Sequence, residues 1–253
     1  MRACLRTYAL RLACGPGESG AVSVLGPSWA LLQPTLLMLI YTVIFSRIVR
    51  VPTDGTPYAL FAYSALLPWT FFSTALSTAT NSLVSHFSLV TKVYFPREIL
   101  PLTYVIAALI DFLVASSLLG VLMPYYQVSL SLQAFYAIPI IAVLAILAIT
   151  ASLFLCAIQV RYRDIGMALP LLLQVWMFAT PVVYPLSMVP ARWRPLYYLN
   201  PMVGVVEGFR RVILLSAPPD FHALGISTLV ALTLLPVAFV YFKQVEATVA
   251  DII

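Results

Sequence analysis

The chain has very few charged residues. Only 9% of its 253 residues are Asp, Glu, Lys or Arg, while 62% are hydrophobic. Soluble domains carry roughly 25% charged residues and under half apolar ones. The charges gather in short islands, separated by apolar stretches of about 17 to 26 residues, the length that crosses the ~30 Å core of a bilayer. A soluble domain is therefore excluded, and the composition predicts an all-α integral membrane protein.

The residue sets that usually carry catalysis are also missing. The sequence has no Gly-x-x-x-x-Gly-Lys-Ser/Thr phosphate loop, so it cannot bind ATP in that manner. The two histidines, His86 and His222, are far apart and make no metal pair. No Ser–His–Asp set or carboxylate pair occurs in the loops. We expect no catalytic residue, no metal site and no cofactor on this chain.

Six apolar stretches predict six transmembrane helices, with a cytoplasmic segment at each end. The net charge of +5 comes from Arg and Lys between the stretches, where it marks orientation and not nucleic-acid binding. With the amino terminus inside, cytoplasmic segments hold eight Arg and Lys against six outside. Residues 1–28 form a cytoplasmic segment with a short basic amphipathic helix, and 243–253 a cytoplasmic tail. The membrane domain, 29–242, contains the spans 29–45, 58–79, 99–123, 134–160, 165–186 and 222–242.

The segment between the last two spans has an unusual pattern. Residues 205–215 are mostly apolar but too few to cross a bilayer, and they include Glu207, Arg210 and Arg211. One interpretation is an external re-entrant helix, which requires surrounding protein or a water-filled cavity. The other is an amphipathic helix lying flat on the external headgroups. The sequence leaves both open.

Seven ordered motifs carry a resemblance to a known family, over residues 24–242. Together they resemble the permease subunit of the ABC-2 type exporters that move O-antigen, capsule and teichoic-acid polymers out of bacteria. One departure is that residues 19–21 read Ser-Gly-Ala where the family has an Arg-Tyr-Lys type cluster. The motifs are LGPSWALLQP (25–34), LPWTFF (67–72), LVTKVYFPR (89–97), VRYRD (160–164), PVVYPL (181–186), LNPM (199–202) and EGFR (207–210).

The resemblance implies partners and a cargo. The permease would form a homodimer in the bacterial cytoplasmic membrane, among membrane lipids, and bind two copies of a separate ATPase that holds ATP and Mg. The implied substrate is a lipid-linked polysaccharide or a polyol phosphate polymer. The alternatives are an ABC-2 exporter of another small or lipidic substrate, or an ion-coupled secondary transporter. An enzyme acting on lipid-linked sugars ranks last, because the loops lack an acid or metal cluster.

The charge island before the third span is the sharpest candidate site. By charge alone it is a cytoplasmic loop that marks topology. An aromatic group flanked by cations also suits docking into a groove of a partner protein, and the resemblance implies that this loop contacts the ATPase. The predicted ATPase-coupling residues are Thr91, Lys92, Val93, Tyr94, Phe95, Pro96 and Arg97.

A second island, Arg161, Tyr162, Arg163 and Asp164, follows the fourth span. It is either a helix-end anchor with a local Arg–Asp pair or a functional element, which would be a second cytoplasmic contact with the ATPase or a gate at the inner mouth. Asp111 is the only acid well inside a predicted span. A charge there is costly unless paired, so it is a functional candidate by default. It is either a proton site of a secondary transporter or an acceptor of hydrogen bonds within the bundle, for example from nearby serines.

Aromatic residues gather near the ends of the spans. Such residues commonly form a belt at the headgroups. The alternative is that some line a channel, where flat rings suit the C–H faces of sugars and let a polymer slide. The sequence does not divide the two groups. The candidate channel aromatics are Trp69, Phe71, Phe72, Trp176, Phe178, Tyr184, Tyr197 and Tyr198.

Overall fold

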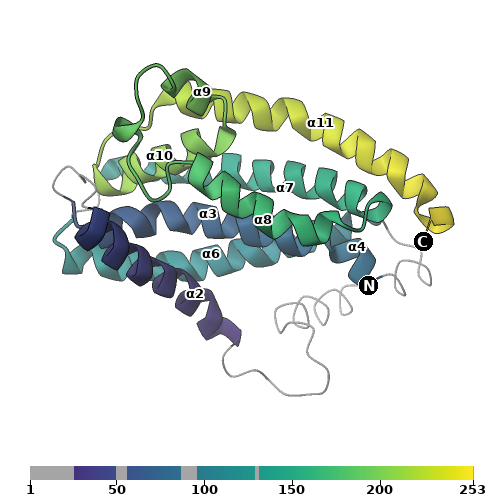
Figure 1. The fold of residues 1–253 in the computed structure, drawn as a ribbon, viewed down its shortest axis with the longest axis horizontal. Helices are drawn as coiled ribbons and strands as arrows, with labels where there is room; N and C mark the ends of the chain where they lie inside the picture. Colours follow the sequence, from purple (N-terminus) through teal and green to yellow (C-terminus); the bar gives the residue numbers. More distant parts are fainter. Residues whose placement is uncertain (1–25, 50–55, 87–95, 129–130, 253) are drawn as a thin grey trace.

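The computed structural model describes residues 26–49, 56–86, 96–128 and 131–252, and within these ranges the chain is helical, with no β-strand. This confirms the all-α class. The long helices run along the long axis of the molecule (Figure 1). In chain order the elements are α2 (Gly26–Tyr41), η1 (Thr42–Val49), α3 (Tyr58–Thr80), α4 (Ser82–Ser85), α6 (Ile99–Tyr125), η2 (Leu132–Tyr136), α7 (Ala137–Arg161), α8 (Ile165–Ala179), η3 (Leu186–Met188), α9 (Arg194–Tyr198), α10 (Pro201–Leu214) and α11 (Phe221–Ile252).

Four of the described helices are long and apolar enough to cross a bilayer, by length and composition. They are Tyr58–Thr80, Ile99–Tyr125, Leu132–Arg161 and Phe221–Glu246. Two shorter apolar helices, Leu32–Phe45 and Ile165–Ala179, fall where the sequence predicts the first and fifth spans. The membrane class is thus confirmed, while the described residues do not establish six complete spans.

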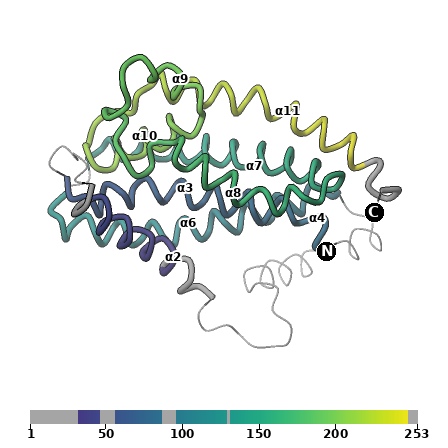
Figure 2. The backbone as a smooth tube through the Cα atoms, viewed as in Figure 1, coloured from purple at the N-terminus to yellow at the C-terminus, as the bar shows by residue number. Residues whose placement is uncertain are grey.

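Helix α3 forms the centre of the bundle. In its most apolar 18-residue window 78% of the residues are buried, against 28% in α6 and 22% in α11. It packs against α2, α6, α7, α8 and α10, and Figure 2 shows it running between α6 and α7. The outer helices expose apolar side chains such as Ile106, Ile110 and Leu229. Continuous exposed apolar surface of this kind suits contact with lipid.

The bundle has two ends, which we name after one residue at each. The Arg97 end carries the beginning of α6, the end of α7, the beginning of α8 and the C-terminal part of α11 (Figure 1). The Tyr184 end carries the end of α8 together with α9 and α10. Pro96 and Arg97, the described part of the predicted coupling loop, belong to the first end, and the segment 205–215 belongs to the second.

The fifth predicted span, 165–186, is shorter in the structure than the sequence predicts. Helix α8 ends at Ala179, and Thr180 adopts φ −108° and ψ 138°. Pro181 explains the stop, because a proline disfavours helical backbone in the residue before it and has no N–H to donate. The apolar run continues past this point, so hydropathy alone predicted too long a helix.

Helix α10 is enclosed by other helices. Eleven of its 14 residues are buried, and it packs against α3, α7 and α11. It begins at Asn200, whose side chain accepts from the backbone N–H of Met202, with Pro201 in the first turn; both are standard features of a helix start. Of the two interpretations of 205–215, the flat surface helix does not fit this burial, whereas the enclosed, re-entrant one does.

Candidate functional site

The structure describes only the last part of the predicted coupling loop. Outside the described residues lie Thr91, Lys92, Val93, Tyr94 and Phe95. Pro96 is exposed, and Arg97 attaches to the C-terminal part of α11. The Arg97 Nη1 donates to the backbone carbonyl of Glu246 over 2.7 Å, and its backbone N–H donates to Glu246 Oε1 over 3.3 Å. The loop therefore enters α6 directly beside α11.

Two further charges complete this contact. Lys243 Nζ donates to Glu98 Oε2 and to Glu246 Oε2, each over 2.8 Å. Partial burial raises the pKa of Glu98, but the hydrogen bond and positive charge of Lys243 outweigh it, so its pKa lies below its ordinary value of 4.5. Sequence analysis did not identify this group. Its only sequence signal is the spacing of Lys243 and Glu246, which places them on one helix face.

The second charge island lies exposed between α7 and α8. Arg161, Tyr162, Arg163 and Asp164 are all exposed. The guanidinium of Arg161 lies 5.9 Å from the ring centre of Tyr162. The local Arg–Asp ion pair considered from the sequence is not formed among the described residues. The four side chains are thus open to solvent, headgroups or a partner.

A buried polar junction joins three helices next to that island. Gln159 Nε2 in α7 donates to Asn81 Oδ1, just after α3, over 3.3 Å, and to the carbonyl of Arg163 over 3.1 Å. A methyl group on Gly166 in α8 would lie 2.6 Å from Asn81 Oδ1 and 2.7 Å from Gln159 Nε2. Glycine is thus needed for this close approach. The junction fixes where α8 leaves the Arg97 end.

The candidate channel aromatics fall into distinct groups. Trp69, Phe72 and Trp176 pack against one another, with 5.2 Å between the ring centres of Phe72 and Trp176. Phe71 packs instead against Phe112 of α6 and is buried. These four rings form part of the core between α3, α6 and α8. Phe72 is completely buried, so it is not a lining residue of any open path in this structure.

The remaining four aromatics lie at or towards the Tyr184 end. Phe178 is exposed, and Tyr198 packs edge-on against His222. The hydroxyls of Tyr184 and Tyr197 are hydrogen-bonded to each other, with 3.1 Å between their oxygens. The Tyr184 hydroxyl also donates to the carbonyl oxygen of Phe178 over 2.7 Å. The sequence did not indicate which of the candidate aromatics lie in the core and which lie at the Tyr184 end.

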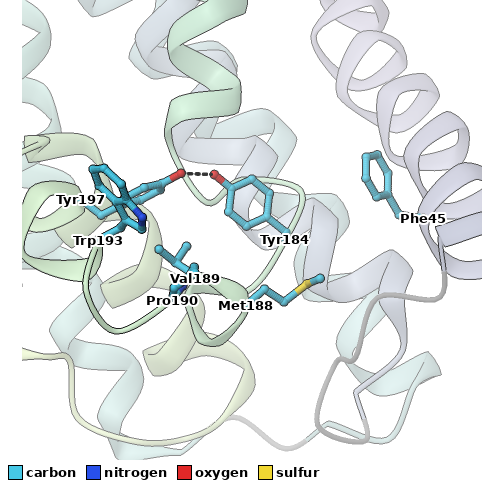
Figure 3. A pocket seen from close by; sticks show the side chains of 7 residues that line it. All are labelled: Phe45, Tyr184, Met188, Val189, Pro190, Trp193 and Tyr197. Atoms are coloured by element: carbon cyan, nitrogen blue, oxygen red, sulfur yellow. Dashed lines mark hydrogen bonds between the residues drawn. The ribbon is translucent and has the colours of Figure 1, made fainter.

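The tyrosine pair borders an open pocket of about 510 Å³. Figure 3 shows the two hydroxyls meeting on one side, with Phe45 of η1 across the pocket from Tyr184. The other lining residues are Met188, Val189, Pro190 and Trp193. The pocket is open and mostly apolar, and the two tyrosine hydroxyls are polar groups at its border.

Arg210 is the central residue of the Tyr184 end. It is 3% exposed, and its Nη2 donates to the carbonyl oxygens of Pro181 and Val182 over 3.0 and 2.9 Å. Its Nη1 pairs with Glu207 over 3.0 Å. Irregular backbone inside a membrane protein is tolerated only where its polar groups are satisfied. Arg210 therefore allows α8 to break at Pro181. The neighbouring Arg211 is only partly buried.

Asn200 and Tyr58 support the same break from two other segments. Trp176 Nε1 donates to Asn200 Oδ1 over 3.1 Å, and Asn200 Nδ2 donates to Thr180 Oγ1 over 2.9 Å. The Tyr58 hydroxyl donates to the carbonyl oxygen of Val183 over 2.7 Å. Arg210 and Trp176 were candidate site residues in the sequence, whereas Asn200 appeared only within the motif LNPM (199–202) and Tyr58 only as the first residue of a predicted span. The pair Asn200-Pro201 was a visible signal for a helix start, although not for the contacts to α8.

Asp111 lies on an exposed part of α6 and has no partner among the described residues. The hydroxyls of Ser116 and Ser117 donate instead to carbonyl oxygens of their own helix, those of Phe112 and Val114. The hydrogen bonds within the bundle that the sequence suggested for this carboxylate are therefore not formed.

Comparison with known proteins gives these sites a family. The chain is 33% identical over 226 residues to the O-antigen export system permease protein RfbA of Myxococcus xanthus, covering 88% of this chain and 85% of that protein. It is 24% identical over 232 residues to the RfbA permease of Klebsiella pneumoniae, covering 91% and 88%. The polysialic acid transport protein KpsM of Escherichia coli is 25% identical over 219 residues, covering 82% of each chain.

The family match covers most of the helical bundle. Residues 21–214 match the family described as ABC-2 type transporter. This range includes the predicted coupling loop, the exposed island after α7 and the whole of α10 with Arg210. It ends before α11. The chain therefore belongs to the ABC-2 type transporter family.

Proposed function

We propose that this chain is the permease subunit of an ATP-driven exporter that moves a lipid-linked polysaccharide across the bacterial cytoplasmic membrane. The observation that carries the proposal is the match over 88% of this chain to an O-antigen export permease. Polymers of the O-antigen, capsule or teichoic-acid type are the cargo class. Both termini are cytoplasmic, and the Arg97 end, which carries the C-terminal part of α11, faces the cytoplasm.

ATP and Mg bind to a separate ATPase, of which two copies dock on the cytoplasmic face. Their contact is the loop Thr91–Arg97, with the exposed island Arg161–Asp164 as a second contact beside the inner mouth. The described part of the loop supports this role, because Arg97 ties it firmly to α11. A displaced loop would therefore move helices of the bundle and not only itself.

The working unit is a homodimer with the polymer path between its halves. Helices α2 and α8 both pack on α3, and the Tyr41 hydroxyl of α2 lies 3.9 Å from the sulfur of Met177 in α8. Both helices expose apolar side chains, including Ile40, Leu171 and Val175. This face suits contact with a second copy. The pocket beside Tyr184 would lie at the outer end of the path, where its rings offer sugars a sliding surface.

The direct test replaces the aromatic pair of the loop. In Tyr94→Ala with Phe95→Ala, the permease should insert normally but lose co-purification with the ATPase and lose export, since aromatic residues dominate protein contacts. Phe135→Ala is the matched control, because Phe135 is an exposed aromatic outside the loop. A double variant that still co-purifies with the ATPase and exports normally would show that the loop is not the coupling contact.

A further inference from the structure

We propose that Arg97, Glu98, Lys243 and Glu246 form a coupling clamp, a set of positioning residues that makes α6 and α11 move together. The inference rests on the proposed function of the loop Thr91–Arg97 as the ATPase contact. It extends that function to α11, which lies beyond the family-matched residues 21–214. Through the clamp, a displacement of the loop reaches the last helix of the chain directly.

At the centre of the clamp, one lysine forms ion pairs with two glutamates. Lys243 lies between the carboxylates of Glu98 and Glu246, at 2.8 Å from each. Arg97 donates two hydrogen bonds to Glu246, from its backbone N–H to the carboxylate and from Nη1 to the backbone carbonyl oxygen. Glu98 precedes the first turn of α6 but makes no side-chain cap to it. Its carboxylate serves the contact with α11 instead of its own helix.

Stability alone does not account for these contacts. A separate apolar cluster already joins α4, α6, α7 and α11 at this end, and it includes Leu83, Leu100, Leu153 and Phe242. Side chains of the clamp are partly exposed, with Lys243 at 39%, and such ion pairs add little to stability. What the clamp adds is a specific attachment. Because Arg97 is hydrogen-bonded to the backbone of α11, a displacement of the end of the loop also acts on that helix.

Helix α11 continues the connection to the other end of the bundle. It packs on α7 and α10, and the Ser227 hydroxyl donates to the carbonyl oxygen of Pro201, at the start of α10, over 2.7 Å. Gly204 of α10 lies so close to α11 that an added methyl group would overlap Ser227 and Ala223. Helix α10 in turn holds the break in α8 through Arg210. Helix α11 thus links the ATPase side to the Tyr184 end.

The first experiment removes the central charge from the intact complex of permease and ATPase. Lys243→Met keeps most of the apolar stem, so the complex should assemble and hydrolyse ATP. Polymer exported per ATP hydrolysed should fall at least about fivefold, the lower range of coupling between sites. Lys243→Arg keeps the charge and should restore most of the ratio. An unchanged ratio in Lys243→Met would overturn the clamp.

A second experiment replaces the charge contact with a covalent one. The variant carries Glu98→Cys together with Lys243→Cys. Because Glu98 and Lys243 touch only at the ends of long side chains, the two shorter cysteines are too far apart to form a disulfide. A short bis-maleimide is therefore used to cross-link them. The uncross-linked variant should show the low ratio, and cross-linking should restore it, because the two helices move together. Loss of export on cross-linking, with the single-cysteine variants unaffected by the reagent, would refute the inference.

The two proposals fail separately. If Tyr94→Ala with Phe95→Ala abolishes ATPase binding while Lys243→Met exports normally per ATP, the loop is the contact and the clamp is not a coupling device. If the aromatic variant binds and exports normally, the assignment of the loop itself is wrong. If Lys243→Met prevents assembly, the cross-linked cysteine pair still tests the clamp. Recovery of the export ratio in that variant requires a fixed distance between α6 and α11 and not a charge.

Discussion

Arg210 of α10 lies flat against Phe61 of α3, with 3.9 Å between its guanidinium carbon and the ring centre. The contact joins α10 to the central helix, while Nη2 of the same guanidinium donates to two carbonyl oxygens just beyond α8. A buried charge is costly unless it is paired and hydrogen-bonded. Here the cost is offset by the ion pair with Glu207, the hydrogen bonds to two carbonyl oxygens and the contact with the Phe61 ring. The side chain of Arg210 thus joins α3, α10 and the segment that follows α8.

Replacing Arg210 should therefore destabilise the Tyr184 end. Arg210→Met leaves Glu207 and two buried carbonyls without their donor, and we expect a loss of about 3 to 5 kcal/mol. Arg210→Lys should recover little, because an ammonium cannot copy the planar fork of donors. Thermal unfolding of the purified complex measures the effect. Arg211→Met, at the partly buried neighbour, is the control and should change the midpoint little.

The close approach of α10 and α11 gives a second prediction. Gly204→Ala inserts a methyl group into the space held by Ser227 and Ala223, and overpacking of this kind costs about 1 to 3 kcal/mol. The midpoint of thermal unfolding should fall, and export with it, because α10 and α11 must separate. Gly225→Ala is the matched control, since nothing lies within 4 Å of its added methyl. Equal midpoints for the two variants would contradict this packing.

Two of the long apolar runs were predicted closely as helices from the sequence. The span 58–79 corresponds to α3 at Tyr58–Thr80, and 99–123 to α6 at Ile99–Tyr125. Such helices depend on local composition and on the thickness of the bilayer. These are properties that a window of sequence contains.

The predictions were less successful where one segment depends on distant ones. The break after Ala179 needs Arg210, Asn200 and Tyr58, which come from three other parts of the chain. Lys243 and Glu98 are separated by 145 residues, so no local pattern could pair them. Arg210 was named from the sequence as an odd charge in an apolar stretch, but its partners could only come from the fold.

The ring and the hydroxyl of Tyr184 can be tested separately. Tyr184→Phe removes the hydrogen bonds to Tyr197 and Phe178 but keeps the ring that borders the pocket. If the ring is the surface that sugars meet, this variant should export close to the wild-type level, because the pocket keeps its ring. Tyr184→Ala should export poorly. The length and amount of surface polymer measure both, and equal loss in both variants would assign the role to the hydroxyl.

Acid should loosen the contact between α6 and α11. The pKa of Glu98 lies below its ordinary value, so its stabilising contribution is present above that ordinary value and is lost as pH falls through the lowered one. The contribution is small, under about 1 kcal/mol, because the ion pair is partly exposed. Glu98→Gln should unfold at a lower temperature than wild type at pH 7, and the difference should shrink below the ordinary pKa. A difference that persists in acid would point to packing and not to charge.

Asp111 decides between ATP-driven export and an ion-coupled rival. Its carboxylate is exposed on α6 and has no partner among the described residues, so neutralising it breaks no contact seen here and relieves the cost of a charge at membrane depth. Asp111→Asn should therefore insert at least as well as wild type and export normally, with export still requiring the ATPase. Ser117→Ala, at another exposed position of the same helix, is the control. Loss of export in Asp111→Asn, together with transport that persists without the ATPase, would instead establish Asp111 as the proton site of a secondary transporter.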